Sequence, residues 1–173
     1  MARYGRQFAG TANEMFPMNS EAPTDTLAPG SEEFGPRGLL VRDPYASQLL
    51  DGQKIWEIRG KATQIRGPVA IIKSGTGHAY GTAKLVRVLG PLDIDDLTLA
   101  SELPRDEREL FRREGLPYSK TYAYVFTDPK WFERPIRYRH PSGAVTWVRL
   151  PELNLEAVSY APPRYRAAQL DLV

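Results

Sequence analysis

The 173-residue chain contains no cysteine, only two histidines and no long hydrophobic run. Without cysteine it can form no disulfide, no thiol nucleophile and no cysteine-ligated zinc site. His78 and His140 are too few for a histidine-rich metal site, so we expect no metal and no cofactor. No apolar stretch approaches the roughly 18 residues of a membrane-spanning helix, and the first residues lack the basic-then-apolar order of a signal peptide. We therefore expect a cytoplasmic location and no membrane partner.

The composition is that of a folded domain with a mild, uneven positive charge. Hydrophobic residues make up 42% of the chain, enough for the core of one domain. Residues 1–38 carry three basic and five acidic residues, whereas the other 135 carry 20 basic and 16 acidic residues. Arginines outnumber lysines by 17 to 6, and planar guanidinium groups suit phosphates and base edges. This charge permits a nucleic-acid partner, and an ordinary solvated surface explains it equally well.

Three segments differ in their patterning. Residues 1–37 are rich in Pro, Gly, Ser, Thr and Glu and show no helical or strand period, so we predict an irregular N-terminal arm. The arm is either a flexible leader or a segment that covers a cleft or binds a protein partner. Residues 38–150 form the predicted domain. Residues 151–173 form a C-terminal extension, which we expect to pack on that domain through Leu153, Leu155 and Val158.

The predicted domain contains many short strands and two helices. Asp43-Pro44 marks a helix start and Gly52 a helix end, which predicts a helix over 44–51; a second is predicted over 104–114. The predicted strands are 39–41, 54–59, 69–73, 78–89, 121–127, 135–139 and 144–150, the last two joined by a hairpin turn at 140–143. The fold class is therefore α+β, a small, partly closed β-barrel with two flanking helices.

The densest chemistry lies in residues 52–59, GQKIWEIR, which contain Lys54, Glu57 and Arg59. In a strand, Glu57 and Arg59 share one face, while Lys54 begins the strand and has the least fixed direction. If Lys54 and Glu57 converge on a pocket, they keep each other charged and offer a donor and an acceptor to a base edge. The alternative is a surface ion-pair ladder, worth about 0–1 kcal/mol.

Residues 73–78, KSGTGH, form a glycine-rich connection between two predicted strands. Its backbone N–H groups, with Lys73, Ser74 and Thr76, could cradle a phosphate, although it lacks the ending of a P-loop. A plain strand connection is the alternative interpretation. His78 could act as a general base, or it could be a hydrogen-bonded structural residue.

Two further groups of residues could contact nucleic acid. Tyr118 could stack on a base while Ser119 and Lys120 contact phosphate, or the three could be a solvated strand entry. The arginines at positions 134, 137 and 139 form a basic strand stripe, which either tracks a phosphate backbone or protects a strand edge by its charge.

The string Gly52-x-Lys54-x-x-Glu57-x-Arg59 resembles the signature of the ASCH domain family, which is related to PUA-like RNA-binding domains. The resemblance covers roughly residues 38–150, because the helix before the string and the segments 81–88, 122–125 and 143–147 also fit the family. It implies a β-barrel in which the motif residues line a cleft between barrel and helices.

The resemblance implies binding of RNA or a nucleotide. The alternative is a small hydrolase acting on RNA phosphodiesters or on an N-acylated cytidine-like nucleoside, with catalytic Lys54 and Glu57. One branch resembles an amidohydrolase with Thr in place of Glu57, and it pairs the motif lysine with a distant glutamate, for which Glu102, Glu107 and Glu109 are candidates. The expected nucleic-acid-binding residues are Lys54, Glu57, Arg59, Lys73, Ser74, Thr76, His78, Tyr118, Ser119 and Lys120. A third hypothesis is a protein-interaction module that works through residues 1–37.

Overall fold

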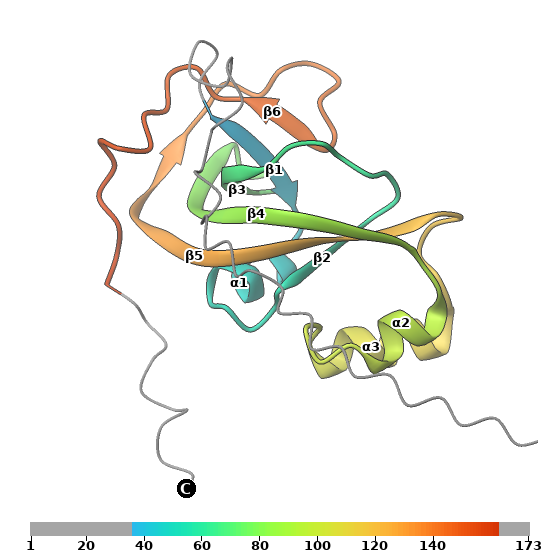
Figure 1. Ribbon diagram of the computed structural model, residues 1–173. Helices are drawn as coiled ribbons and strands as arrows, with labels where there is room; N and C mark the ends of the chain where they lie inside the picture. The colour runs from blue at the N-terminus through green and yellow to red at the C-terminus, as the bar shows by residue number, and fades with distance from the viewer. Residues whose placement is uncertain (1–35, 163–173) are drawn as a thin grey trace, which may run out of the picture.

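The computed structural model describes residues 36–162 (Figure 1). The predicted arm therefore lies outside the described residues except for its last two positions, as do residues 163–173 of the C-terminal extension. The elements are β1 (Arg37–Val41), α1 (Tyr45–Leu50), β2 (Trp56–Arg59), β3 (Gly67–Lys73), β4 (His78–Leu92), α2 (Ile94–Leu99), α3 (Arg105–Glu114), β5 (Thr121–Arg137) and β6 (Trp147–Arg149).

One mixed six-stranded sheet organises the molecule, in the order β2-β5-β4-β3-β1-β6. β1 runs parallel to β3, and every other neighbouring pair is antiparallel. Among the strands of residues 36–162, β2 pairs only with β5 and β6 pairs only with β1, so this sheet is not closed. The α+β class is as predicted, whereas the predicted barrel is not confirmed.

The described part contains three helices, one more than predicted. α1 and α3 lie where the sequence places them, and the unpredicted α2 packs beside α3 at one end of β4 and β5 (Figure 1). α2 begins with a capping box: the Asp93 carboxylate accepts from the Asp96 N–H, and the Asp96 carboxylate accepts from the Asp93 N–H, both at 2.9 Å.

The structure differs from two of the strand predictions. The segments predicted at 121–127 and 135–139 belong to one continuous strand, β5, which pairs along its length with β4. The predicted hairpin across 140–143 is wrong, because β6 lies antiparallel to β1 at the other side of the sheet. Residues 138–146 therefore cross from one strand of the sheet to a distant one.

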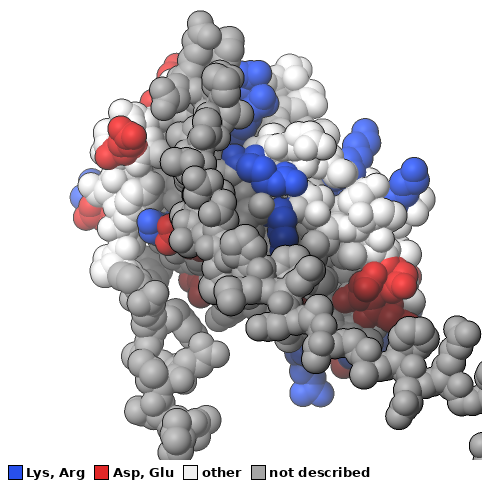
Figure 2. Space-filling model, in the orientation of Figure 1, with Lys and Arg blue, Asp and Glu red and all other residues white. Residues whose placement is uncertain are grey.

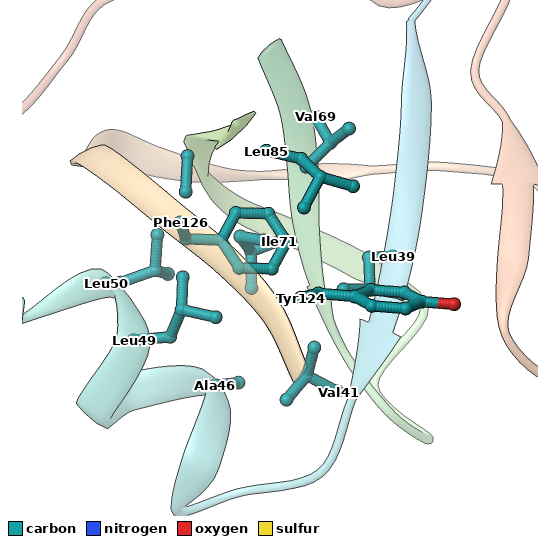
Figure 3. Packing of buried hydrophobic residues seen from close by; sticks show 11 residues of the cluster. Leu39, Val41, Ala46, Leu49, Leu50, Val69, Ile71, Leu85, Tyr124 and Phe126 are labelled. Carbon is teal, nitrogen blue, oxygen red and sulfur yellow. The ribbon is translucent and has the colours of Figure 1, made fainter. Parts of the chain in front are cut away.

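The core has two faces that follow the alternation of the central strands. Leu39 and Val41 point to one face, where they pack with Leu49 and Leu50 of α1 (Figure 3). Leu40 belongs to the other face, which the C-terminal extension covers with the partly buried residues Leu153, Leu155 and Val158. A third cluster packs α2 and α3 against the sheet end through the buried residues Ile58, Leu97, Leu103, Phe111 and Ala123.

Candidate functional site

A cleft of about 430 Å³ opens where β1, β2 and α3 approach one another. Its polar lining residues are Arg42, Lys54, Glu57, Arg59, Ser74, Glu107 and Thr146. Its apolar and aromatic lining includes Tyr45, Leu110, Phe111, Tyr118 and Val145. A concave site with apolar walls and a few convergent charged groups is the usual form of a ligand pocket.

The connection between α1 and β2 brings Lys54 into this cleft. Gly52 adopts φ +74°, a left-handed conformation that suits glycine, and turns the chain after the helix. The Lys54 N–H then donates to the Gln48 carbonyl at 3.1 Å, and the Ile55 N–H donates to the Glu102 carbonyl at 2.9 Å. Lys54 therefore precedes β2. The direction of its side chain is not set by the alternation of side chains along that strand.

Lys54 is almost fully buried between two glutamates. Its Nζ donates to both carboxylate oxygens of Glu107, at 2.6 and 2.7 Å, and lies 3.3 Å from Glu57 Oε2. It also lies 4.4 Å from the centre of the Tyr45 ring. Lys54 and Glu57 thus converge in a concave pocket, and the alternative of an exposed surface ladder does not describe this site.

Arg59 holds Glu57 from the other side. Its Nη2 lies 2.9 Å from Glu57 Oε1 and donates to the Leu40 carbonyl at 2.6 Å, which ties β2 to β1. Among the described residues, however, Glu57 Oε2 and Arg59 Nε are buried without a hydrogen-bond partner. Glu57 Oε2 has only the Lys54 ion pair at 3.3 Å. A buried polar atom without a hydrogen bond costs about 1–3 kcal/mol, so a ligand group that bonded to either atom would be favoured.

Burial raises the pKa of the Glu107 carboxyl above its ordinary value, while the charge and hydrogen bonds of Lys54 act in the opposite direction. Glu57 and Asp106 add to the increase, because their negative charges disfavour a third one nearby. A carboxyl with a raised pKa next to a lysine holds its proton more readily than an ordinary glutamate, which is a common property of groups that transfer protons.

Tyr118 and Ser74 contribute to the walls of the cleft. The Tyr118 ring lies against Gly60, where an added Cβ would come within 2.8 Å of it. The side chain is 44% exposed, so its ring is accessible to a ligand. Ser74 follows β3 and is exposed at the rim.

The other predicted site residues lie outside this lining. Lys73 forms an ion pair with Asp43 at 2.9 Å and donates a hydrogen bond to Ser47 Oγ at 2.8 Å. It therefore connects the end of β3 to the start of α1. Thr76 and His78 bond within their own loop, where His78 Nδ1 lies 2.7 Å from the Thr76 carbonyl oxygen. Ser119 and Lys120, which follow Tyr118, are exposed and do not line the cleft.

Sequence reasoning placed Glu107 only among three unmatched glutamates. A sharper signal was present, because Glu107 and the apolar Phe111 are four residues apart and therefore share a helix face. Leu103 and Phe111 are buried, and Glu107 between them is 5% exposed. A glutamate on the apolar face of a helix needs a buried cation, and Lys54 is that cation.

Charges outside the cleft are distributed unevenly. In Figure 2 the acidic side chains at the lower right gather where Figure 1 draws α2 and α3, while basic side chains lie on the upper and central parts of the same face. In the described part of the chain no group of three or more histidine, cysteine or acidic residues is arranged to hold a metal ion. None of the helices in residues 36–162 has the length and apolar character needed to cross a membrane.

Comparison with known proteins agrees with this geometry. A family model described as the ASCH domain matches residues 39–136. A crystal structure of a mutant ASCH protein from Zymomonas mobilis has a TM-score of 0.52 at 16% identity, covering 68% of this chain and 89% of that chain. The structure titled ASCH from the same organism has a TM-score of 0.50 at 17% identity, covering 69% and 89%. These similarities concern the fold, and a comparison with curated proteins gave no match.

The matched region contains the complete string from Gly52 to Arg59, as well as Glu107 and Tyr118 of the cleft. It extends from β1 almost to the end of β5 and so includes five strands and all three helices of the described part. The family match therefore concerns the part of the chain that builds the cleft. The chain belongs to the ASCH domain family.

Proposed function

We propose that the cleft binds a base of single-stranded RNA, or a free nucleotide, through its Watson–Crick edge. The observation that supports this most directly is that Glu57 Oε2 and Arg59 Nε, on two side chains that line the cleft, are buried without a hydrogen-bond partner. On this edge cytosine and adenine each carry an exocyclic amino group beside an acceptor nitrogen. The amino group would donate to Glu57, and the acceptor would receive a hydrogen bond from Arg59.

The remaining groups have complementary roles in this proposal. The Tyr118 ring stacks on the base, a contact worth about 1–3 kcal/mol in single-strand binding proteins. Arg42 and Ser74, both exposed at the rim, contact the phosphate or ribose. Lys54 is engaged by Glu107, so its role is to hold the neighbouring Glu57 carboxylate in place. A duplex hides its Watson–Crick edges, which is why the proposal specifies single strands.

The test compares labelled oligocytidylate and oligouridylate, because uracil lacks the amino group. We expect the wild type to prefer oligocytidylate and Glu57→Gln to bind it about tenfold more weakly, a loss of about 1.4 kcal/mol. The matched control is Glu109→Gln on the exposed side of α3, which should bind like the wild type. Equal binding of both oligonucleotides, together with an unaffected E57Q variant, would exclude base reading by Glu57.

The Lys54–Glu107 pair also favours the alternative, a small hydrolase. In that reaction Glu107 takes a proton from water, whose oxygen attacks an acyl carbon or a phosphorus atom, while Lys54 stabilises the developing negative charge. The proton then passes to the leaving amine or ribose oxygen. Glu57 binds the base or moves protons in this scheme, and Lys54 is essential.

This alternative is tested by following product formation from single-stranded RNA and from N-acylated cytidine. An enzyme should release product, and Glu107→Gln should abolish that release while oligocytidylate binding persists. Glu109→Gln serves again as the matched control. Binding without any product in the wild type would leave the cleft as a binding site and rule out the hydrolase for these substrates.

A further inference from the structure

A second cavity of about 430 Å³ lies away from the cleft, where the end of β5 meets β6 and the first residues of the C-terminal extension. Its charged lining consists of Arg137, Arg139, Arg149 and a single carboxylate, Glu152. It shares no lining residue with the cleft. The cavity therefore has an excess of positive charge and forms a separate feature of the surface.

Two of its arginines lack any neutralising partner in the described part of the chain. Neither Arg137 nor Arg139 makes a side-chain hydrogen bond or ion pair with another residue in 36–162. Arg137 is the last residue of β5 and Arg139 follows two positions later, and both line the cavity. A guanidinium group presents several donors in one plane and matches the oxygens of a phosphate.

A further like charge lies beside this cavity. Arg37 of β1 stands directly opposite Arg149 of β6 in the sheet register. Burial lowers the pKa of the Arg37 guanidinium, and the charge of Arg149 lowers it further. Like charges placed directly opposite one another in a sheet are unfavourable for folding.

The floor and rim of the cavity are well ordered by packing and hydrogen bonds. Leu150 is buried in the second face of the core, with Ile136 and Leu153 partly buried beside it. Tyr138 is fixed because its N–H donates to the Gly77 carbonyl at 3.1 Å, and its hydroxyl lies 2.8 Å from His140 Nδ1. The arginines thus project from a fixed concave surface.

One short segment connects the cavity to the cleft. Pro141 borders the cavity, and Val145 and Thr146 border the cleft. Beside α3, which contributes one wall of the cleft, α2 and its cap present the carboxylates of Asp93, Asp95 and Asp96, which repel phosphates. A strand whose base occupies the cleft is therefore favoured to continue over residues 141–146 towards the arginines.

We propose that the arginine cavity is a phosphate-binding subsite that holds the backbone of the single strand whose base enters the cleft. This proposal rests on the proposed function, which identifies the bound molecule as a single nucleic-acid strand. It adds a second contact between the protein and that strand. Arg137 and Arg139 donate to phosphate oxygens, and they contribute affinity without reading the sequence.

The experiment measures oligocytidylate affinity against salt concentration for the full chain. The test variant is R137Q/R139Q, and the matched control is R87Q/R113Q, which removes two exposed arginines outside both cavities. We expect the test variant to bind about tenfold more weakly. We also expect it to lower the slope of log affinity against log salt by about 1.4, or about 0.7 for each lost contact. The control should keep the wild-type slope.

The outcomes separate this proposal from the proposed function. Weakened binding by R137Q/R139Q with an unaffected E57Q would support the subsite and reject base reading in the cleft. Equal effects of the two double variants would overturn the subsite, because they would show only a general charge effect. The subsite would also be overturned if inorganic phosphate, at matched ionic strength, stabilised the wild type but not R137Q/R139Q while both bound RNA equally. That result would assign the cavity to free phosphate.

Discussion

At the scale of single residues, the cleft depends on one buried cation. Lys54 neutralises Glu107 and contributes to holding Glu57, whose other partner is Arg59. Removing one member of a buried pair leaves an uncompensated charge in a poorly solvated place, whereas replacing both members by apolar side chains is often neutral. The structural and functional roles of Lys54 are therefore coupled, and a test of function needs variants other than Lys54→Ala.

We predict that Lys54→Met lowers the free energy of unfolding by about 3–5 kcal/mol, because Glu107 loses its counter-charge. The double variant K54M/E107M should recover most of this loss. Urea denaturation at neutral pH measures both. A single variant as stable as the wild type would mean that Lys54 does not form this buried pair in solution.

The raised pKa of Glu107 predicts a pH dependence of stability. Because the folded-state pKa lies above the ordinary value of 4.5, the folded protein binds this proton more tightly than the unfolded chain does. Glu107 therefore contributes stability that is fully present below pH 4.5 and is lost as the pH rises through its folded-state pKa.

Urea denaturation between acidic and neutral pH tests this linkage. Above pH 4.5, the free energy of unfolding should fall less with rising pH in Glu107→Gln than in the wild type. Glu109→Gln, on the exposed side of the same helix, should keep the wild-type dependence. Identical pH profiles for all three proteins would show that the Glu107 pKa is not raised by folding.

At the scale of elements, short connections position the side chains of the cleft. Gly60 directly follows β2 and packs against the ring of Tyr118, which precedes β5. The close approach fixes the Tyr118 ring at the wall of the cleft. No local pattern in the sequence indicates this contact, because the two residues meet only through the pairing of β2 with β5.

We predict that Gly60→Ala weakens oligocytidylate binding about threefold to tenfold, because its Cβ would approach the Tyr118 ring to 2.8 Å and displace it. Tyr118→Ala should have a similar effect, and Tyr118→Phe should retain binding because stacking requires only the ring. Affinity is measured by the retention of labelled RNA, with the melting temperature as a check on folding. Full binding by Tyr118→Ala would remove this ring from the proposed site.

At the scale of the whole molecule, the two faces of the open sheet have different covers. α1 covers the face formed by Leu39 and Val41, while the C-terminal extension covers the other. The extension is held by backbone hydrogen bonds from Glu133 to Ser159 and from Ala161 to Trp131, at 2.8 and 2.9 Å. Its described part is therefore integral to the fold.

We predict that the double variant L155A/V158A lowers the free energy of unfolding by about 1–3 kcal/mol, because both side chains are partly buried on this face. Glu156→Ala, an exposed change between them, should have little effect. Chemical denaturation provides the comparison. Equal stability of the double variant and the control would show that the extension does not cover the core in solution.

The sequence by itself determined the α+β class, the positions of α1 and α3 and the family motif, because these depend on local signals. Helix caps, apolar periodicity and the string from Gly52 to Arg59 are each contained within a few neighbouring residues. α2 also carries a local signal in the sequence, the Asp93–Asp96 capping box, although apolar periodicity does not indicate this helix.

Only the tertiary structure decided what depends on distant pairing. The open sheet edges, the placement of β6 beside β1 and the burial of Lys54 against Glu107 each join residues far apart in the chain. Local propensity carries no information about such partners, since the free energy of burying a charge depends on what the fold places around it. The motif identified the polar side chains, and the three-dimensional arrangement decided which of them share one cleft.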